Sequence, residues 1–477
     1  MRCDLRPARH AIIGRPLRTV TIRENAFAIR KSESLVRMLA IQDSGPDARS
    51  GVAPLNDGRT LAQVAYKTIA DGLSKLVSLA ITVAAARRLS SDDFGILALA
   101  MTTGWLLSVA SDAGLPLYLA KRLARGTAAG ERASFAAVGE VLRLRGVLAS
   151  VSAAAGLAIA LALAPGSSFV AFWIVVVAQL LNAVLETLAH AYRGLGRSDI
   201  ESTIVVSQRL VTAAAAILAL LWSPSLLLLA TALVIPPAAA LAVSIQTARQ
   251  LLSTSGGMRS DEAIAPRAAP FSHVAAGLGI LISAIYFRCD VFFIERWHGL
   301  EAVGTYNAAF RIVEALRLFP AALLAVSYPA LCTATDGKAV GALLVPLVAS
   351  GAAMAAVVYL AAPTALGLLY GPRFVEGAPA LATLALAVPL FFVNYALTNQ
   401  VIAWDGQRAY LAVVTAALFA NLLGNVMLIP GQGMQGAALS TVATEIVVTA
   451  GCLLALNRIR KESAAPLRAR AGSRGVR

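Results

Sequence analysis

The chain has 477 residues, of which 58% are hydrophobic and only 14% are charged. Charged residues make up about 25% of a typical soluble domain, so this composition excludes an ordinary soluble protein and predicts a membrane protein. The formal net charge of +15 does not indicate a nucleic-acid partner, because most of the basic residues lie in the tails and in short connections between apolar segments.

The first 60 residues form a segment of a different kind. Residues 1–60 contain many arginines with scattered Gly, Pro and Asp, and no apolar run long enough for a signal peptide or a span. We expect a disordered basic cytoplasmic tail. A start codon assigned too far upstream would produce the same kind of segment, and the sequence does not separate the two.

Twelve apolar segments follow, mostly near the ~20 residues that an α-helix needs to cross roughly 30 Å of hydrocarbon. They are rich in Leu, Ala and Val, so we expect helices and not barrel strands. The predicted spans are residues 63–86, 95–118, 144–164, 169–192, 202–222, 226–247, 271–294, 304–328, 340–362, 379–402, 410–430 and 437–457. The predicted fold class is an all-α integral membrane protein with about 12 transmembrane helices.

The basic residues between the spans predict the topology. They are concentrated in the connections after the even-numbered spans, from Lys121 to Arg408. The opposite connections carry only Arg87, Arg88, Arg296 and Arg373. Because cytoplasmic connections carry an excess of Lys and Arg, both termini are expected in the cytoplasm.

Two separated stretches indicate an internal duplication. RRLSSDDFGILALA (87–100) aligns with RWHGLEAVGTYNAA (296–309), which matches Gly95 to Gly304 at an offset of 304 − 95 = 209. Farther along, Gly196 matches Gly406 at an offset of 406 − 196 = 210. The near-equal offsets predict a duplicated six-span unit whose copies begin in the same orientation, because six is even. Chance similarity between apolar sequences is the alternative.

The duplication and the composition together predict the domain organisation. The longest inner connection contains SGG and two prolines, and so reads as a flexible link. The expected parts are a tail at 1–60, a six-helix bundle at 61–250, a cytoplasmic linker at 251–270, a second six-helix bundle at 271–457 and a basic cytoplasmic tail at 458–477.

Five stretches carry a resemblance to a known family. They are RRLSSDDFGILALA (87–100), DAGL (112–115), YFRCDVFFIERWHGLEAVGTYNAAFRIVEALRLFPAALLAVSYPAL (286–331), LYGPRF (369–374) and IPGQGMQGAALST (429–441). In their order and spacing, the sequence resembles the polysaccharide (O-antigen type) flippases of the multidrug/oligosaccharidyl-lipid/polysaccharide exporter superfamily. The resemblance implies two pseudo-symmetric six-helix bundles around a central cavity in the bacterial inner membrane. The bundles would alternate between inward and outward openings and move a polyprenyl-linked sugar outward.

Charged side chains within the second-half spans are the first candidates for a binding site, because a charge at the bilayer centre costs at least ~2.5–3.5 kcal/mol unless it faces a partner or a wet cavity. Arg288 would either extend to the outer headgroups or serve as a cavity cation for a diphosphate or an acidic sugar. Asp290 lies roughly 200° around the helix from Arg288, so the two do not readily pair. The eighth span presents Arg311, Glu314 and Arg317 along one side, which would line the cavity or form an internal network.

Charges in the first half offer two further candidates. Asp71 and Lys75 are four residues apart in the first span, and we expect them at the inner part of the cavity or in a local ion pair. Glu186 and Arg209 lie at similar depth on helices joined by a short turn, which favours a structural salt bridge.

Glu445 is a lone carboxylate in the last span. A carboxylate in apolar surroundings can hold a proton, so Glu445 is the candidate for coupling transport to protons or sodium. A hydrogen bond to a neighbouring hydroxyl such as Thr441 is the alternative. Four amides would either join helices or contact sugar hydroxyls: Asn394, Asn399, Asn421 and Asn425.

No feature of the sequence predicts an enzyme, a metal site or a cofactor. The four cysteines are far apart and show no metal-ligand spacing. The leading prediction is a transporter that flips a polyprenyl-diphosphate-linked oligosaccharide from the cytoplasmic to the outer face, with membrane lipids and polysaccharide biosynthesis enzymes as partners. The alternatives are a drug/cation antiporter, and a membrane glycosyltransferase, polymerase or ligase. Enzymes of this kind need a sizeable loop, and the outer connections are short.

Overall fold

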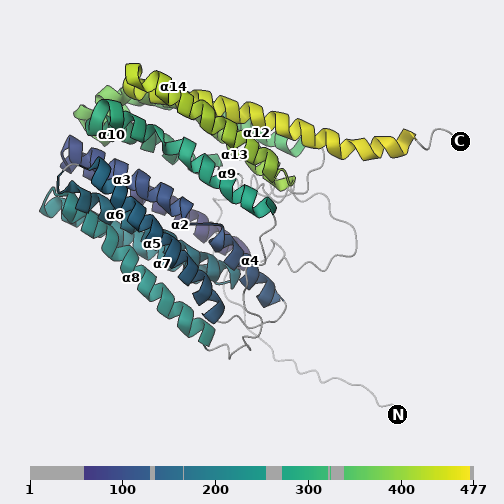
Figure 1. Ribbon diagram of the computed structural model, residues 1–477, viewed down its shortest axis with the longest axis horizontal. Helices are drawn as coiled ribbons and strands as arrows, with labels where there is room; N and C mark the ends of the chain where they lie inside the picture. The colour runs from purple at the N-terminus through teal and green to yellow at the C-terminus, as the bar shows by residue number, and fades with distance from the viewer. Residues whose placement is uncertain are drawn as a thin grey trace, which may run out of the picture. The chain divides into compact units, whose positions relative to one another are not determined.

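The computed structural model describes residues 58–128, 135–164, 166–253, 271–320, 323 and 338–472, and every structural statement below concerns these residues. Their regular elements are helices (Figure 1). Most of the predicted N-terminal tail and cytoplasmic linker lies outside the described residues.

Seven helices make up the first half of the described chain. They are α2 (Gly58–Arg88), α3 (Ser91–Ala110), α4 (Leu115–Ala128), α5 (Phe135–Leu163), α6 (Ser168–Gly194), α7 (Ser198–Trp222) and α8 (Leu226–Ser253). Helix α6 packs against α3, α5 and α8, and α2 packs against α7. The purple to teal ribbons of Figure 1 show this group.

The second half contains the remaining elements. They are α9 (Phe271–Arg288), α10 (Asp290–Leu316), α12 (Lys338–Leu369), the short 3-10 helix η1 (Pro372–Gly377), α13 (Ala378–Ala403) and α14 (Gln407–Gly472). Helix α13 packs between α12 and α14, and α14 also packs against α9. Helix α10 packs against α3 of the first half, so these two helices join the halves.

Two of the long helices are folded back at a glycine. Gly299 within α10 has φ 78° and Gly433 within α14 has φ 54°, a left-handed conformation that glycine adopts without steric cost. The ring nitrogen Nε2 of His298 lies 2.7 Å from the carbonyl oxygen of Ile429, which brings the two turns together. Each of these helices therefore supplies parts of two predicted spans.

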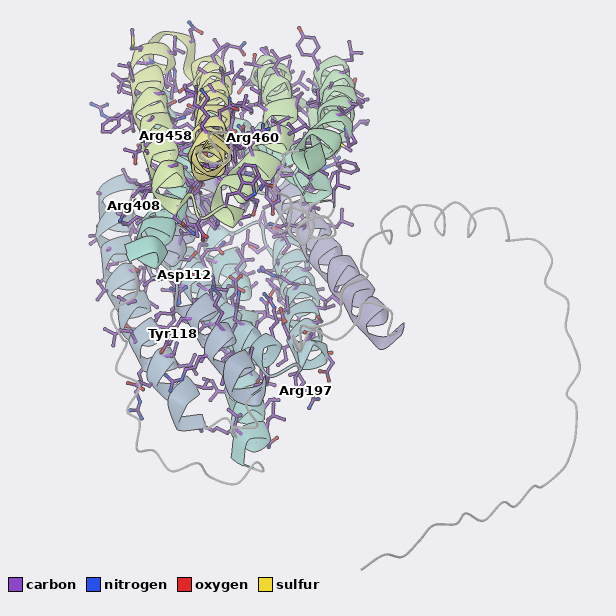
Figure 2. The ribbon with its side chains drawn as sticks, turned by 90° about the vertical axis from the view of Figure 1, so that its right-hand side faces the viewer. Asp112, Tyr118, Arg197, Arg408, Arg458 and Arg460 are labelled. Carbon is purple, nitrogen blue, oxygen red and sulfur yellow. The ribbon has the colours of Figure 1, made fainter. Side chains whose placement is uncertain are left out.

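Because α14 folds back, its beginning and its end lie at the same end of the second half. Figure 2 labels Arg408, near the beginning of α14, and Arg458 and Arg460, near its end. A Cβ added at Gly406, just before α14, would lie 2.9 Å from a side-chain carbon of Ile459. The helix continues to Gly472, so the predicted tail at 458–477 is helical over most of its length. This grouping of basic residues accords with the predicted topology, which remains a prediction.

Nine helical runs in the described residues are long and apolar enough to cross a membrane, and two of them contain the glycine turns. The all-α membrane fold is therefore confirmed. The second predicted span, 95–118, is wrong beyond Ala110, where the helix breaks. Ala113 and Gly114 have positive φ, and the Asp112 carboxylate accepts a hydrogen bond of 2.9 Å from the Gly114 N–H. Such a side-chain turn competes with helix continuation, and α4 begins only at Leu115.

Candidate functional site: a charged cavity between the halves

A cavity of about 390 Å³ lies between helices of both halves. Helices α2 and α3 line it from the first half, and α9, α10, α13 and α14 from the second. Its charged and other polar non-aromatic lining residues are Lys75, Ser283, Glu314, Arg317, Asn394, Thr398, Asn399 and Glu445. Its aromatic lining residues are Trp105, Tyr286, Phe287, Phe391, Tyr395 and Tyr410.

Arg317, directly after α10, is held in the cavity by aromatic rings. Its guanidinium carbon lies 4.2 Å from the centre of the Phe287 ring and 5.2 Å from that of Phe391. Such cation–π contacts orient the guanidinium without using its N–H groups. Among the described residues, no side chain or carbonyl accepts a hydrogen bond from the Arg317 guanidinium. Its donors are therefore available to a ligand in the cavity.

Lys75 brings a second cation from the opposite half. It lies on α2, lines the cavity and is exposed. Within the described part of the chain it forms no hydrogen bond or ion pair. An ammonium group on a flexible stem can follow an anion that enters the cavity. The two available cations thus come from different halves of the protein.

The charges around Glu314 leave an excess of positive charge. The Glu314 carboxylate forms an ion pair of 2.9 Å with Arg311, and it also lies within the electrostatic influence of Arg288, Lys75 and Arg317. One carboxylate therefore faces four cations. Asp290 offsets Arg288, and Glu445 lies within the electrostatic influence of Arg317, so four cations face three carboxylates and one positive charge is left over.

Arg288 follows neither of the two alternatives given for it, because it is buried and does not line the cavity. Its Nη2 donates hydrogen bonds to Thr102 Oγ1 (3.0 Å) and Asn307 Oδ1 (2.6 Å), and its guanidinium lies 4.5 Å from the Phe310 ring centre. Thr102 belongs to α3, so Arg288 ties the second half to the first.

The other predicted site residues also differ in whether they line the cavity. Asp290 is fully buried and accepts a hydrogen bond of 2.5 Å from the Tyr306 hydroxyl, while Arg311 pairs with Glu314. Neither lines the cavity. The side chain of Asp71 lies outside the described residues. Of the predicted cavity residues, the structure therefore places Lys75, Glu314 and Arg317 in the lining.

Glu445 lines the cavity, and its partner is an amide. Its Oε2 accepts a hydrogen bond of 2.7 Å from Asn394 Nδ2, and Asn394 Oδ1 accepts one of 2.7 Å from Thr449 Oγ1. The predicted neighbour Thr441 instead donates to the Ala437 carbonyl. Asn421 and Asn425 join α14 to Cys289 and to each other, which is the helix-contact role.

The predicted salt bridge between Glu186 and Arg209 is not formed, although both residues are described. Glu186 is exposed on α6, and the Arg209 Nε has no hydrogen-bond partner. Arg145 was not among the predicted site residues, although it is only 1% exposed and donates to the Ser108 carbonyl (3.3 Å) at the end of α3. Arg145 lies within the electrostatic influence of Asp112 and Glu186, and Arg209 lies within that of Glu186.

Membrane-length helices in two halves, with a polar cavity between them, define a multi-pass membrane protein of transporter architecture. Residues 60–334, more than half of the chain, match the family described as polysaccharide biosynthesis protein. The chain belongs to this family. No curated protein matches the sequence.

Solved structures share the fold at low sequence identity. An outward-facing multidrug resistance MATE family transporter of the MOP superfamily has a TM-score of 0.58 and 14% identity, covering 84% of this chain and 96% of its own. A MATE transporter of Vibrio cholerae has a TM-score of 0.55 and 12% identity, and the match covers 85% of this chain and 97% of the transporter. The lipid II flippase MurJ in an inward closed conformation has a TM-score of 0.51 and 13% identity, and the match covers 83% of this chain and 87% of MurJ. At these identities the comparison establishes the fold alone.

Proposed function

We propose that the protein is a flippase that moves a polyprenyl-diphosphate-linked oligosaccharide from the cytoplasmic to the outer face of the bacterial inner membrane. The observation that carries this proposal is the Arg317 guanidinium, which rests on Phe287 and Phe391 with its donors unused by the described residues. A planar guanidinium binds phosphate oxygens through two parallel hydrogen bonds. Membership in a family of polysaccharide biosynthesis proteins supports a glycan substrate.

The second cation explains how a diphosphate would be held between the halves. A diphosphate presents oxygens on two phosphorus atoms, so Arg317 and Lys75 can each take one end. The surplus positive charge around Glu314 favours an anion over a neutral ligand. Because the two cations belong to different halves, binding and release of the diphosphate would bias the position of one half against the other.

Reciprocal contacts between arginines and helix ends support alternating access. Arg87 donates to the Leu369 carbonyl (2.8 Å) and to the Leu368 carbonyl at the end of α12. Arg373 donates to the Leu89 carbonyl (2.7 Å) and to the Ala86 carbonyl at the end of α2. The last carbonyls of a helix lack partners within the helix and carry partial negative charge. We assign these bonds as a closed gate, which lies at the outer end in the predicted topology.

The proposed cycle has the gate closed while the glycan lipid enters from the cytoplasmic side. Opening of the gate would then release the glycan outward. Protons or sodium ions would drive the cycle through Glu445, and enzymes of polysaccharide biosynthesis would supply and consume the lipid. The proposal assigns no chemical reaction to the protein.

A drug/cation antiporter is the second candidate, because Glu314, Glu445 and several aromatic rings also line the cavity. Carboxylates and aromatic faces bind organic cations. The surplus of cations around Glu314 argues against this function.

Reconstitution of the full chain into vesicles distinguishes the two. Vesicles would contain a fluorescent polyprenyl-diphosphate-linked oligosaccharide, and an added glycosidase would report how fast inner-leaflet glycan reaches the outside. We expect rapid exposure with the native chain and with Arg296→Ala, an exposed arginine outside the cavity, and loss with Arg317→Ala. Exposure no faster than in protein-free vesicles, together with uptake of tetraphenylphosphonium, would establish the antiporter instead.

A further inference from the structure

We infer that Glu445 and the amide that holds it form a subsite for the sugar next to the diphosphate, and that this subsite accepts an uncharged sugar and rejects a uronic acid. The inference rests on the proposed function. It assigns the cavity two chemically different ends, a cationic end at Arg317 and Lys75 and a hydrogen-bond-accepting end at Glu445.

The Glu445 side chain is fixed in position by Asn394. The Asn394 amide nitrogen donates to the Glu445 carbonyl (2.9 Å) and to its Oε2 (2.7 Å), and Thr449 Oγ1 donates to the Asn394 oxygen (2.7 Å). Both ends of the amide are thus used within the protein. Asn394 is therefore a positioning residue, and Glu445 is the group left to meet a ligand.

One oxygen of Glu445 has no partner. The residue is only 4% exposed, and among the described residues no donor reaches its Oε1. This oxygen is not among the fully buried atoms, so it faces the cavity, where it offers an acceptor to a ligand donor. Sugar hydroxyl and acetamido N–H groups are such donors.

Aromatic rings beside Glu445 fit the apolar faces of a sugar. Tyr286, Tyr395 and Tyr410 line the same cavity. The Tyr410 ring packs directly against Gly279, because an added Cβ there would lie 2.6 Å from a ring carbon. This packing fixes the orientation of the ring. A site that combines aromatic faces with a few polar groups is typical of binding pockets for small polar molecules.

The position of this subsite places it next to the diphosphate. Glu445 and Arg317 line the same cavity and lie within electrostatic range of one another, without forming an ion pair in the described structure. The cavity volume of 390 Å³ is near the small end of the usual range of about 300–1,000 Å³. A ligand whose phosphates contact Arg317 therefore brings its first sugar against the Glu445 wall.

Charge then decides which sugars fit. A uronic acid would place its carboxylate against the Glu445 carboxylate in a site with little water, and like charges repel most strongly there. The cations that could neutralise it are occupied by the diphosphate. A neutral hexose or an N-acetylated sugar meets no such repulsion and satisfies Oε1.

The test is equilibrium binding of the full chain, purified in detergent, to two synthetic polyprenyl-diphosphate sugars that differ only at C6, glucose and glucuronic acid. We expect the native chain to prefer the neutral sugar by at least about tenfold, the effect of one unfavourable buried charge contact. Glu445→Gln keeps the shape and removes the charge, and its preference should fall to within about threefold. Glu301→Gln, an exposed carboxylate outside the cavity, should retain the full preference.

The outcomes separate this inference from the proposed function. Equal binding of both sugars by the native chain overturns the inference and leaves the flippase proposal standing, whereas binding of neither sugar contradicts the flippase proposal. A Glu445→Gln variant that keeps the native preference overturns the inference, whether or not the variant retains transport. If Glu445→Gln fails to fold, Glu445→Asp is the second variant, because it shortens the side chain by one methylene. It should weaken the preference for the neutral sugar, and an unchanged preference contradicts the subsite.

Discussion

A Cβ added at Gly304 would lie 3.3 Å from the backbone nitrogen of Gly95, so α10 and α3 meet almost backbone to backbone at these two glycines. At Gly95 an added Cβ would lie 2.0 Å from the carbonyl oxygen of Leu300, a distance that no side chain can occupy. These are the two positions that the alignment of the halves matches. The contact fixes how closely one half approaches the other.

Gly95→Ala should destabilise the protein by about 1–3 kcal/mol, because the helices must separate to admit the methyl group. The midpoint of thermal unfolding of the purified protein in detergent measures this. Gly146→Ala is the matched control, since an added Cβ there meets nothing within 4 Å. The control should be neutral or slightly stabilising, as alanine is the better helix former. Equal midpoints for the two variants would contradict the close packing.

Loss of either gate arginine should open the cavity at the gate end. Arg87→Ala removes the bonds to the last carbonyls of α12, so a membrane-impermeant thiol reagent should reach a cysteine placed at Ser283 faster than in the parent, in a background without native cysteines. Arg88→Ala alters the neighbouring exposed arginine and should have no effect. Labelling no faster in Arg87→Ala than in Arg88→Ala would rule out the gate.

Arg288 and Arg317 should respond differently to alanine. Arg288→Ala leaves Asn307 and Thr102 without their buried donor, which should cost about 1–3 kcal/mol of stability. Arg317→Ala removes a side chain whose N–H groups bond to no described residue, so the fold should persist while ligand binding is lost. Thermal unfolding and ligand binding of both variants, measured side by side, check this. A stable Arg288→Ala protein that has lost only ligand binding would show that Arg288 serves the ligand and not the fold.

The all-α membrane fold was predictable, because apolar segments of membrane length form helices in a bilayer; the number of twelve helices stays a prediction. The break in the helix after Ala110 was not predictable, because apolar residues continue on both sides of the Asp112–Gly114 turn (Asp112 is labelled in Figure 2). The roles of the arginines depended on partners far away in the sequence. Arg288 bonds to Thr102, 186 residues earlier, and no periodicity within its own helix could indicate that contact.

Arg317 was among the predicted cavity residues, but the reason for its role was not visible in the sequence. The Phe287 and Phe391 rings that hold it come from two other helices, and their meeting depends on how those helices are rotated. The Asn394 clamp on Glu445 is a similar case, because it joins α13 to α14. Charge inside a span thus marked the candidates, and packing between helices determined which of them reach the cavity.

The most direct test of the account is the affinity of the purified full chain for a polyprenyl-diphosphate-linked oligosaccharide. We expect Arg317→Ala and Lys75→Ala each to weaken binding by about tenfold or more, since a hydrogen bond to a charged group contributes about 1.5–3 kcal/mol. Arg317→Lys should recover part of the loss, because it restores the charge without the planar fork. Arg296→Ala, an exposed arginine outside the cavity, should bind as the native chain does. Native affinity in a chain that carries both Arg317→Ala and Lys75→Ala would contradict the account.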